Sequence, residues 1–281
     1  MRIGLLQFAP DFTNVSANTR KASSILDASQ LHPGSIDLLI LPELAFAGYV
    51  FPDKAAIEPF IEHSDAGPTF AWAHRTAREM QCHVQVGLAR AVEASDGAEV
   101  SWRNSVIVVG PQGQLVAVYD KHFLYEVDER WATEGPGFQA IQLLDHTVGL
   151  GICMDLNPYK FQSPFEAFEF ANFHVNSGSE LISCSMAWVL SKADAEKGLK
   201  TVTPIVGTLN YWAARLSPLI DTTKGDTKRI IFAVCNRTGG ENGTDFCGSS
   251  CVLEFSGGGA SLLGVLGHKE EALLIINTEE H

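Results

Sequence analysis

The segment Val148-Gly-Leu-Gly-Ile-Cys153-Met-Asp155 is the most informative part of this sequence. Residues 148–152 form an uncharged apolar run, which is typical of a strand buried on both faces. Its two glycines allow a close approach of neighbouring backbone, and Cys153 follows where the strand gives way to a turn. A cysteine in such a run is most often a packing residue. In open α/β sheets, however, the carboxyl ends of the strands are also where ligands bind.

Similar apolar runs recur along the chain and predict further buried strands, at residues 3–9, 38–41, 84–89, 106–109, 181–184, 230–234 and 273–276. Helical spacing of apolar residues lies between several of these runs, as in Ile205, Leu209, Trp212, Ala213 and Leu216. Turns at residues 110–113 and 257–259 join other strands directly. The order predicts an α/β fold with mixed sheets, and the lack of a linker or low-complexity tract favours a single domain over residues 1–281.

Composition excludes several classes of protein. The chain has 281 residues, is 46% hydrophobic and carries 33 acidic against 20 basic residues, a net charge of -13. Such a charge repels phosphate backbones and anionic membranes, so we expect neither nucleic acid nor a membrane as partner. No apolar run reaches the ~18 residues of a spanning helix, and the first residues lack the pattern of a secretion signal. Six cysteines scattered through the chain suggest a reducing, cytoplasmic setting.

Two other strands are also followed by reactive side chains. Glu43 comes directly after residues 38–41 and Pro42, and Lys121 follows the strand expected at 115–119. Taken singly, each of these would be interpreted as a surface residue. A cysteine becomes a nucleophile only as its thiolate, which needs a nearby cation, a base or helix-end amides. If the three strand ends share one rim, they supply a nucleophile, a base and an oxyanion stabiliser.

The segments Leu-Pro-Glu43, Tyr-Asp-Lys121 and Gly-Ile-Cys153-Met-Asp resemble, in that order, the Glu-Lys-Cys triad of the nitrilase superfamily of carbon-nitrogen hydrolases. The resemblance covers nearly the whole chain, since residues 2–10, 236–242 and 246–250 match as well. It implies a four-layer α-β-β-α sandwich of nitrilase type with mixed sheets. It also implies that two copies pair through their helical faces into a homodimer, and that no cofactor is needed.

The same resemblance implies roles for individual residues. Cys153 would attack the carbon of a carboxamide, and Glu43 would take the thiol proton and later pass one to the departing ammonia. Lys121 and the backbone N–H of Met154 would stabilise the oxyanion. Glu129 lies eight positions after Lys121 and resembles the family's second glutamate, which orients the lysine or the substrate amide. Glu126 competes with Glu129 for that role.

Residues 123–131, 153–161 and 184–188 look like the N-terminal amidase branch, which converts an N-terminal Asn or Gln of a protein to Asp or Glu. Many superfamily members carry an Arg-Phe-Pro-Glu-like run shortly after the cysteine, where this chain has Asn157-Pro-Tyr-Lys-Phe. The difference favours a peptide or protein N-terminus as substrate. A small-molecule amidase or ω-amidase, a carbamoylase and a nitrilase stay open as alternatives, as does a non-catalytic binding scaffold.

Candidate substrate contacts follow from the segments that line the cavity in this family: Tyr49, Phe51, Trp131 and Trp188. Core packing explains each of them too. A substrate with a protonated α-amine needs an acidic partner, for which Asp128 and Asp155 are candidates. Asp155 has a structural interpretation too, because superfamily members with unrelated substrates place an acid at the same distance after the cysteine.

Other kinds of site receive little support. None of the nine histidines makes an H-E-x-x-H run, and Cys247 and Cys251 lack a second pair, so no metal site is expected. The Gly149 and Gly151 pair lacks the third glycine of a dinucleotide-binding loop. His122 beside Lys121 would suit a Cys-His enzyme, but the resemblance favours the carboxylate as base.

Overall fold

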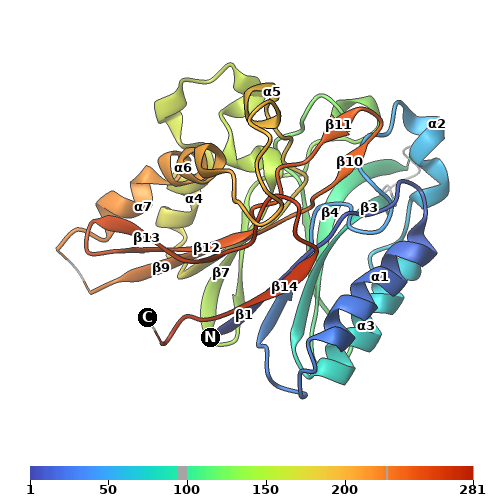
Figure 1. Ribbon diagram of the computed structural model, residues 1–281, viewed down its shortest axis with the longest axis horizontal. Helices are drawn as coiled ribbons and strands as arrows, with labels where there is room; N and C mark the ends of the chain where they lie inside the picture. The colour runs from blue at the N-terminus through green and yellow to red at the C-terminus, as the bar shows by residue number, and fades with distance from the viewer. Residues whose placement is uncertain (94–99, 226, 281) are drawn as a thin grey trace.

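The computed structural model describes residues 1–93, 100–225 and 227–280. Two six-stranded mixed sheets pack face to face, and helices cover the outer face of each (Figure 1). This is the four-layer α-β-β-α sandwich that the resemblance implies, with the mixed sheets that the sequence pattern predicts. The central strands β1, β2, β8 and β9 are nearly continuous apolar runs because they are covered on both faces, by the other sheet and by helices.

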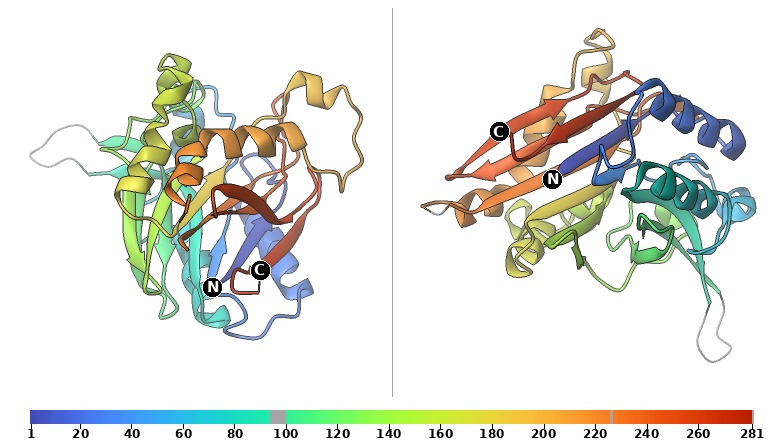
Figure 2. Two further views of the ribbon diagram at one scale, coloured as in Figure 1. Left: turned by 90° about the vertical axis from the view of Figure 1, so that its left-hand side faces the viewer. Right: turned by 90° about the horizontal axis from the view of Figure 1, so that it is seen from below.

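The first sheet has the strand order β14-β1-β2-β3-β4-β5. Strands β1, β2 and β3 run parallel to one another, and β14, β4 and β5 join by antiparallel pairing. Because β1 and β14 pair, the beginning and the end of the described chain lie side by side (Figure 2). The bounds are β1 Arg2–Gln7, β2 Leu38–Ile40, β3 His83–Val92, β4 Ser101–Val109, β5 Leu115–Asp120 and β14 Ala272–Asn277, with helices α1 Val15–Ala28, α2 Lys54–Ile57, η1 Glu58–Phe60 and α3 Pro68–Met80.

The second sheet has the order β13-β12-β9-β8-β7-β6, with β7, β8 and β9 parallel. Its strands are β6 Gln139–Leu143, β7 His146–Ile152, β8 Leu181–Met186, β9 Arg229–Asn236, β12 Cys251–Ser256 and β13 Gly259–Val265, and a hairpin is formed by β10 Gly240–Glu241 and β11 Thr244–Asp245. The helices are η3 Asp128–Arg130, η4 Cys153–Leu156, η5 Tyr159–Phe161, η6 Phe165–Ala167, α4 Glu169–Asn176, α5 Lys192–Ala195, α6 Val206–Arg215 and α7 Ser217–Thr222.

The main core lies between the two sheets. One buried cluster combines Ile3 and Val106 of the first sheet with Leu150 and Val234 of the second. A second cluster lies between the first sheet and helices α1 and α3. Among the described residues, no helix has both the length and the apolar character needed to cross a membrane.

The glycine pair of β7 makes room for helix α4. A Cβ atom added to Gly149 would lie 2.3 Å from His174 Nδ1, and one added to Gly151 would lie 2.6 Å from Phe170 Cζ. His174 and Phe170 lie four positions apart and therefore share one face of α4. These glycines thus allow helix α4 to pack directly against β7, the strand that leads to Cys153.

Candidate active site

The structure brings Glu43, Lys121 and Cys153 together where strands β2, β5 and β7 end. Lys121 Nζ lies 2.6 Å from Glu43 Oε1, and neither side chain is exposed to solvent. Cys153 is 7% exposed, and the charges of Glu43 and Lys121 both act on its thiol. Three residues that are far apart in the sequence therefore form one buried cluster that reaches solvent at the sulfur.

Both oxygens of the Glu43 carboxylate are held in place. Oε1 accepts hydrogen bonds from Lys121 Nζ and from Asn104 Nδ2, the latter at 2.7 Å, and Oε2 accepts one from Ala187 N at 2.8 Å. Gly87 in β3 makes this position possible, because a Cβ there would lie 2.6 Å from Leu44 N and 2.8 Å from Glu43 Cα. The carboxylate is thus fixed by both sheets, since Asn104 belongs to the first and Ala187 follows β8 of the second.

Asp128 is the second acid beside the lysine. Its Oδ2 lies 2.6 Å from Lys121 Nζ and accepts from Tyr49 OH at 3.3 Å, and its Oδ1 accepts from Asn104 Nδ2 at 2.9 Å. The resemblance gave the role of orienting the lysine or the substrate amide to Glu129, with Glu126 in competition. Within the described residues, however, no ion pair joins either of them to Lys121. Glu129 is exposed and pairs with Lys160 at 3.3 Å, and Glu126 is exposed as well. Asp128 is therefore the residue that orients the lysine in this structure.

Neither acid expected to receive a substrate amine is free to do so. Asp128 is committed to Lys121, and Asp155 is wholly buried, where it accepts from Tyr119 OH at 2.8 Å and from the backbone N–H of Ile152, also at 2.8 Å. The backbone N–H groups of His122 and Phe123 also donate to Asp155, through its Oδ1. The structure thus gives both residues other partners, and Asp155 ties the end of β7 to the segment that carries the lysine.

Electrostatics separate the protonation states of the three groups. Burial raises the pKa of Cys153, and the Glu43 carboxylate raises it further, so the resting sulfur is a thiol. Burial also raises the pKa of Glu43 despite the opposing charge of Lys121. Burial alone would lower the pKa of Lys121, but Asp128 and Glu43 outweigh it and raise that pKa, so the lysine stays an ammonium. The cluster therefore combines the protonated thiol of Cys153, the Glu43 carboxylate with its raised pKa and the ammonium of Lys121.

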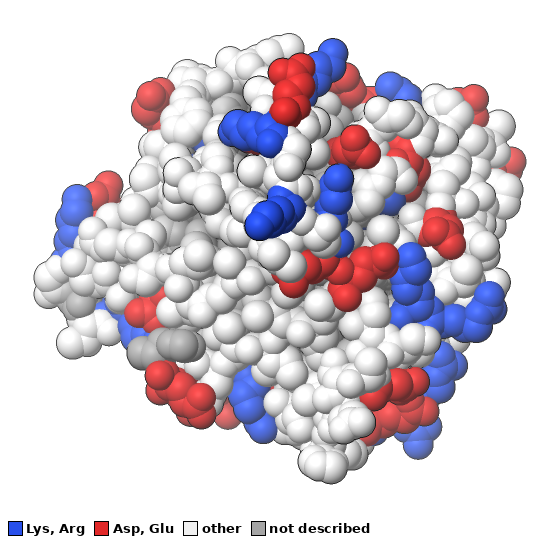
Figure 3. Space-filling view, viewed as in Figure 1, with Lys and Arg blue, Asp and Glu red and all other residues white. Residues whose placement is uncertain are grey.

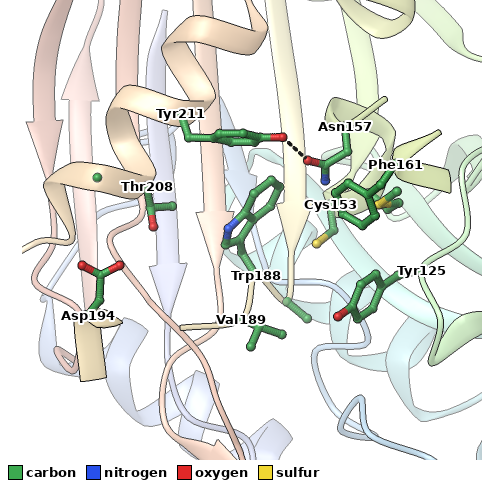
Figure 4. A pocket seen from close by; sticks show the side chains of 12 residues that line it. Tyr125, Cys153, Asn157, Phe161, Trp188, Val189, Asp194, Thr208 and Tyr211 are labelled. Atoms are coloured by element: carbon green, nitrogen blue, oxygen red, sulfur yellow. Dashed lines mark hydrogen bonds between the residues drawn. The ribbon is translucent and has the colours of Figure 1, made fainter. Parts of the chain in front are cut away.

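A cavity of about 510 Å³ opens beside Cys153 (Figure 4). Of the residues expected from sequence, Met154 and Trp188 line it. Tyr49, Phe51 and Trp131 do not, because they are buried together in a cluster behind the site. The cavity wall also contains residues that sequence analysis missed: Tyr125, Asn157, Phe161, Ala187, Asp194 and Tyr211.

The cavity has an aromatic centre and a more distant acidic end. Tyr211 OH donates to Asn157 Oδ1 at 2.7 Å, and Trp188 lies between these residues and Asp194 (Figure 4). Asp194 is on the far side of Trp188 from Cys153 and accepts from Lys197 Nζ at 2.6 Å. The cavity wall near the Cys153 sulfur therefore consists mainly of aromatic side chains, and none of the described lining residues beside it has a carboxylate.

An ion pair behind the site supports the loop that carries Tyr49. Arg237 Nη1 lies 2.5 Å from Glu241 Oε2, both side chains being buried, and Glu241 Oε1 accepts from the backbone N–H of Tyr49 at 2.7 Å and of Val50. These residues belong to the segment 236–242 that carried part of the resemblance. Sequence analysis assigned Arg237 and Glu241 no role, because the segment around them is polar and gives no sign that the pair is buried.

Among residues 1–93, 100–225 and 227–280, no group of three or more His, Cys, Asp or Glu side chains is placed to hold a metal ion.

Residues 2–158 match the family model described as carbon-nitrogen hydrolase. The protein N-terminal amidase of Schizosaccharomyces pombe (strain 972 / ATCC 24843) is 35% identical over 295 aligned residues, which cover 100% of both chains. The chain belongs to the carbon-nitrogen hydrolase family. It is therefore an enzyme, an amidase-type hydrolase of carbon-nitrogen bonds, and the resemblance stated from its motifs is confirmed.

Other members of the carbon-nitrogen hydrolase family extend the comparison. The protein N-terminal amidase of Saccharomyces cerevisiae (strain ATCC 204508 / S288c) is 34% identical over 221 residues, covering 70% of this chain and 47% of the relative. A crystal structure of an N-terminal amidase with an Asn-Glu-Ala peptide has a TM-score of 0.85 at 24% identity and covers 98% of this chain and 96% of its own. The nitrilase-type sandwich is thereby confirmed for the fold.

Proposed function

We propose that this hydrolase removes ammonia from the side-chain carboxamide of an N-terminal Asn or Gln of a peptide or protein, leaving Asp or Glu. The observation that carries the proposal is the buried cluster of Glu43, Lys121 and Asp128 beside a cysteine that lines an open cavity. The full-length similarity to an N-terminal amidase supports the choice of substrate. A cavity of about 510 Å³ has the size of a typical small-ligand pocket.

The first half of the proposed reaction forms a thioester. Glu43 accepts the proton of the Cys153 thiol as the sulfur attacks the carboxamide carbon, and the carbonyl electron pair moves to the oxygen. The ammonium of Lys121 and the backbone N–H of Met154 hold that oxyanion, each such contact contributing about 3 kcal/mol in a preorganised site. When the carbon-nitrogen bond breaks, protonated Glu43 gives its proton to the leaving NH₂ group, and ammonia departs.

The second half of the reaction uses the same groups in turn. A water molecule gives a proton to Glu43 and attacks the thioester carbon, and the resulting oxyanion occupies the same position beside Lys121. The carbon-sulfur bond then breaks, the carboxylic acid leaves, and the sulfur recovers its proton from Glu43. The raised pKa of Glu43 suits a group that must both accept and return a proton.

Binding of the substrate α-ammonium is assigned to aromatic faces. The acids first considered, Asp128 and Asp155, are both engaged elsewhere, and Asp194 is paired with Lys197. Trp188, Tyr211 and Tyr125 line the cavity, and ring faces attract cations. The proposal therefore places the ammonium against these rings while the side-chain amide reaches Cys153.

The proposal is tested by ammonia release from short peptides that begin with Asn or Gln, compared with the same peptides acetylated at the N-terminus. We expect release from the free peptides only, with Asp or Glu in the product by mass spectrometry, and none with the Cys153→Ala variant. Equal rates of ammonia release from free and acetylated peptides would contradict the proposal. Release only from free amides, ureido acids or nitriles would instead favour the small-molecule alternatives, and no release at all would favour the binding scaffold.

Further features are proposed with this function. A single domain over residues 1–281 is supported by the core cluster that residues of both sheets share. A homodimer is supported by the superfamily resemblance, and sedimentation at micromolar concentration tests it. A cytoplasmic location is supported by six free, buried cysteines. The absence of a nucleic-acid or membrane partner is supported by the net charge of -13 and by the interspersed acidic and basic side chains on the face in Figure 3.

A further inference from the structure

A second cavity, of about 290 Å³, adjoins the one that contains Cys153. Tyr125, Met154 and Phe161 line both cavities, so the two share a wall. Leu124 and Glu126 line the second cavity and not the first. A substrate bound at Cys153 that extended past Tyr125 and Phe161 would reach this second cavity.

Phe161 is held in an unusual position between the two cavities. Its φ is 55° and that of Lys160 is 51°, a left-handed conformation that non-glycine residues rarely adopt. The Phe161 side chain is nevertheless 58% exposed, and its ring meets the edge of Tyr125 with centroids 6.5 Å apart. Backbone strain that leaves a large apolar ring in solvent is typical of a residue that contacts a ligand.

The charges around the second cavity are unbalanced. Lys160 lies on its wall and pairs with Glu129 at 3.3 Å. Glu126 is exposed on the same wall, and none of the ion pairs within the described residues includes it. A ligand that carries a positive charge would therefore find a carboxylate there that no other cation occupies.

We propose that the second cavity is a subsite for the peptide chain that follows the substrate's N-terminal residue, and that it prefers a lysine or arginine. The inference rests on the proposed function. The alkyl stem of such a side chain packs against Phe161 and Tyr125, and its charged end reaches Glu126. The opposite end of the main cavity offers no comparable charge, because Asp194 is already paired with Lys197.

Substrate length provides the first test. Kinetics are measured with L-asparagine amide, which ends before the subsite, and with the tripeptides Asn-Lys-Ala and Asn-Glu-Ala. Phe161→Ala is expected to raise KM for Asn-Lys-Ala about tenfold and to leave kcat unchanged. Because Phe161 also lines the cavity of Cys153, KM for L-asparagine amide is expected to rise as well, but much less. Phe161→Tyr should restore the wild-type KM. Leu262→Ala removes an exposed apolar side chain from β13, away from both cavities, and serves as the control.

Charge reversal provides the second test. The wild-type enzyme is expected to favour Asn-Lys-Ala over Asn-Glu-Ala, and Glu126→Lys is expected to invert that order. Glu79→Lys makes the same change on the exposed surface of α3 and should not alter the preference. A wild-type enzyme without preference, or a Glu126→Lys variant that keeps the original order, overturns the subsite.

The outcomes distinguish the subsite from the function on which it rests. If no Asn-initiated substrate releases ammonia, the proposed function fails. If all of them do, but Phe161→Ala affects tripeptide and amide alike, only the subsite fails. Thr208 lies at the opposite end of the main cavity, where a Thr208→Trp variant adds bulk. If this variant excludes tripeptides but still accepts the amide, the substrate peptide extends past Trp188, and the subsite is again overturned.

Discussion

Lys121 Nζ lies 2.6 Å from Asp128 Oδ2, the same distance that separates it from Glu43 Oε1. One buried ammonium therefore has two buried carboxylates, which leaves an excess of negative charge. Asn104 donates to both carboxylates and keeps them in one arrangement. Burial raises the pKa of Glu43, and the charge of Asp128 raises it further. Asp128 thus both orients the lysine and tunes the base.

An Asp128→Asn variant should therefore change the pH profile. In our mechanism Glu43 must be deprotonated, so activity falls as the pH drops through its pKa. Removing the charge of Asp128 lowers the pKa of Glu43, and the acid limb of kcat/KM should move to lower pH. The maximal rate should fall about a hundredfold because Lys121 loses a partner. Glu129→Gln is the control and should retain the wild-type profile, and a shift of its acid limb would contradict the assignment.

Cys153 should react with iodoacetamide before the other five cysteines. It is 7% exposed and lines the cavity, whereas each of the others is at most 1% exposed. Because its pKa is raised, the labelling rate should increase with pH beyond neutrality. Peptide mapping by mass spectrometry identifies the labelled residue, and earlier modification of Cys82 or Cys247 would contradict the geometry.

Gly87→Ala should displace the catalytic carboxylate without touching a catalytic side chain. The added Cβ would press on Leu44 N and Glu43 Cα, which are backbone atoms that cannot rotate away. We expect a loss of about a hundredfold in kcat/KM from misplacement of Glu43, and about 1–3 kcal/mol of stability from overpacking. Gly259→Ala is the matched control, because the nearest atom to its Cβ would be 3.8 Å away. Full activity in the Gly87→Ala variant would refute the steric argument.

His174 should make stability depend on pH. Burial lowers its pKa to about 3, so the folded chain keeps it neutral in mild acid. An unfolded histidine has a pKa of about 6.5, so the unfolded chain takes up this proton first. The free energy of unfolding is therefore undiminished above the pKa of the unfolded histidine and decreases as the pH falls below it. Over this range the unfolded chain binds about one proton more than the folded chain.

Urea unfolding of wild type and His174→Gln at several pH values tests this contribution. The difference in unfolding free energy between the two should change across the acid range in the direction that disfavours the wild type. His32→Gln alters an exposed histidine and should show no such trend. Parallel curves for wild type and His174→Gln would show that the buried ring does not contribute.

Much of the fold could be predicted from the sequence because strands covered on both faces leave continuous apolar runs. Glu43, Lys121 and Cys153 each lie at the end of an expected strand, but their roles were indicated by the resemblance to the nitrilase superfamily. Asp128 was missed in its true role because it lies in the short helix η3, where successive side chains point about 120° apart. A shift of one position exchanges a residue that faces the lysine for one that faces solvent.

The cavity wall was harder to predict because its members come from segments with no common pattern. Ala187 donates its backbone N–H to Glu43, and a backbone donor of this kind cannot be recognised from the residue type. Asn104 did carry a signal, as an amide within the apolar strand β4, but its partners depend on how the two sheets meet. Phe51 and Trp131 look like cavity residues by type and are core residues by position.

The bond from Ala187 N to Glu43 Oε2 joins the two halves of the sandwich at the reacting centre. A chain in which only one half has formed holds either a sulfur without its proton acceptor or a carboxylate without its sulfur. During synthesis or refolding, such a molecule is chemically inert towards amides. Hydrolytic competence is thus acquired in one step at the end of folding, and recovered turnover reports the fraction of chains whose halves have docked correctly.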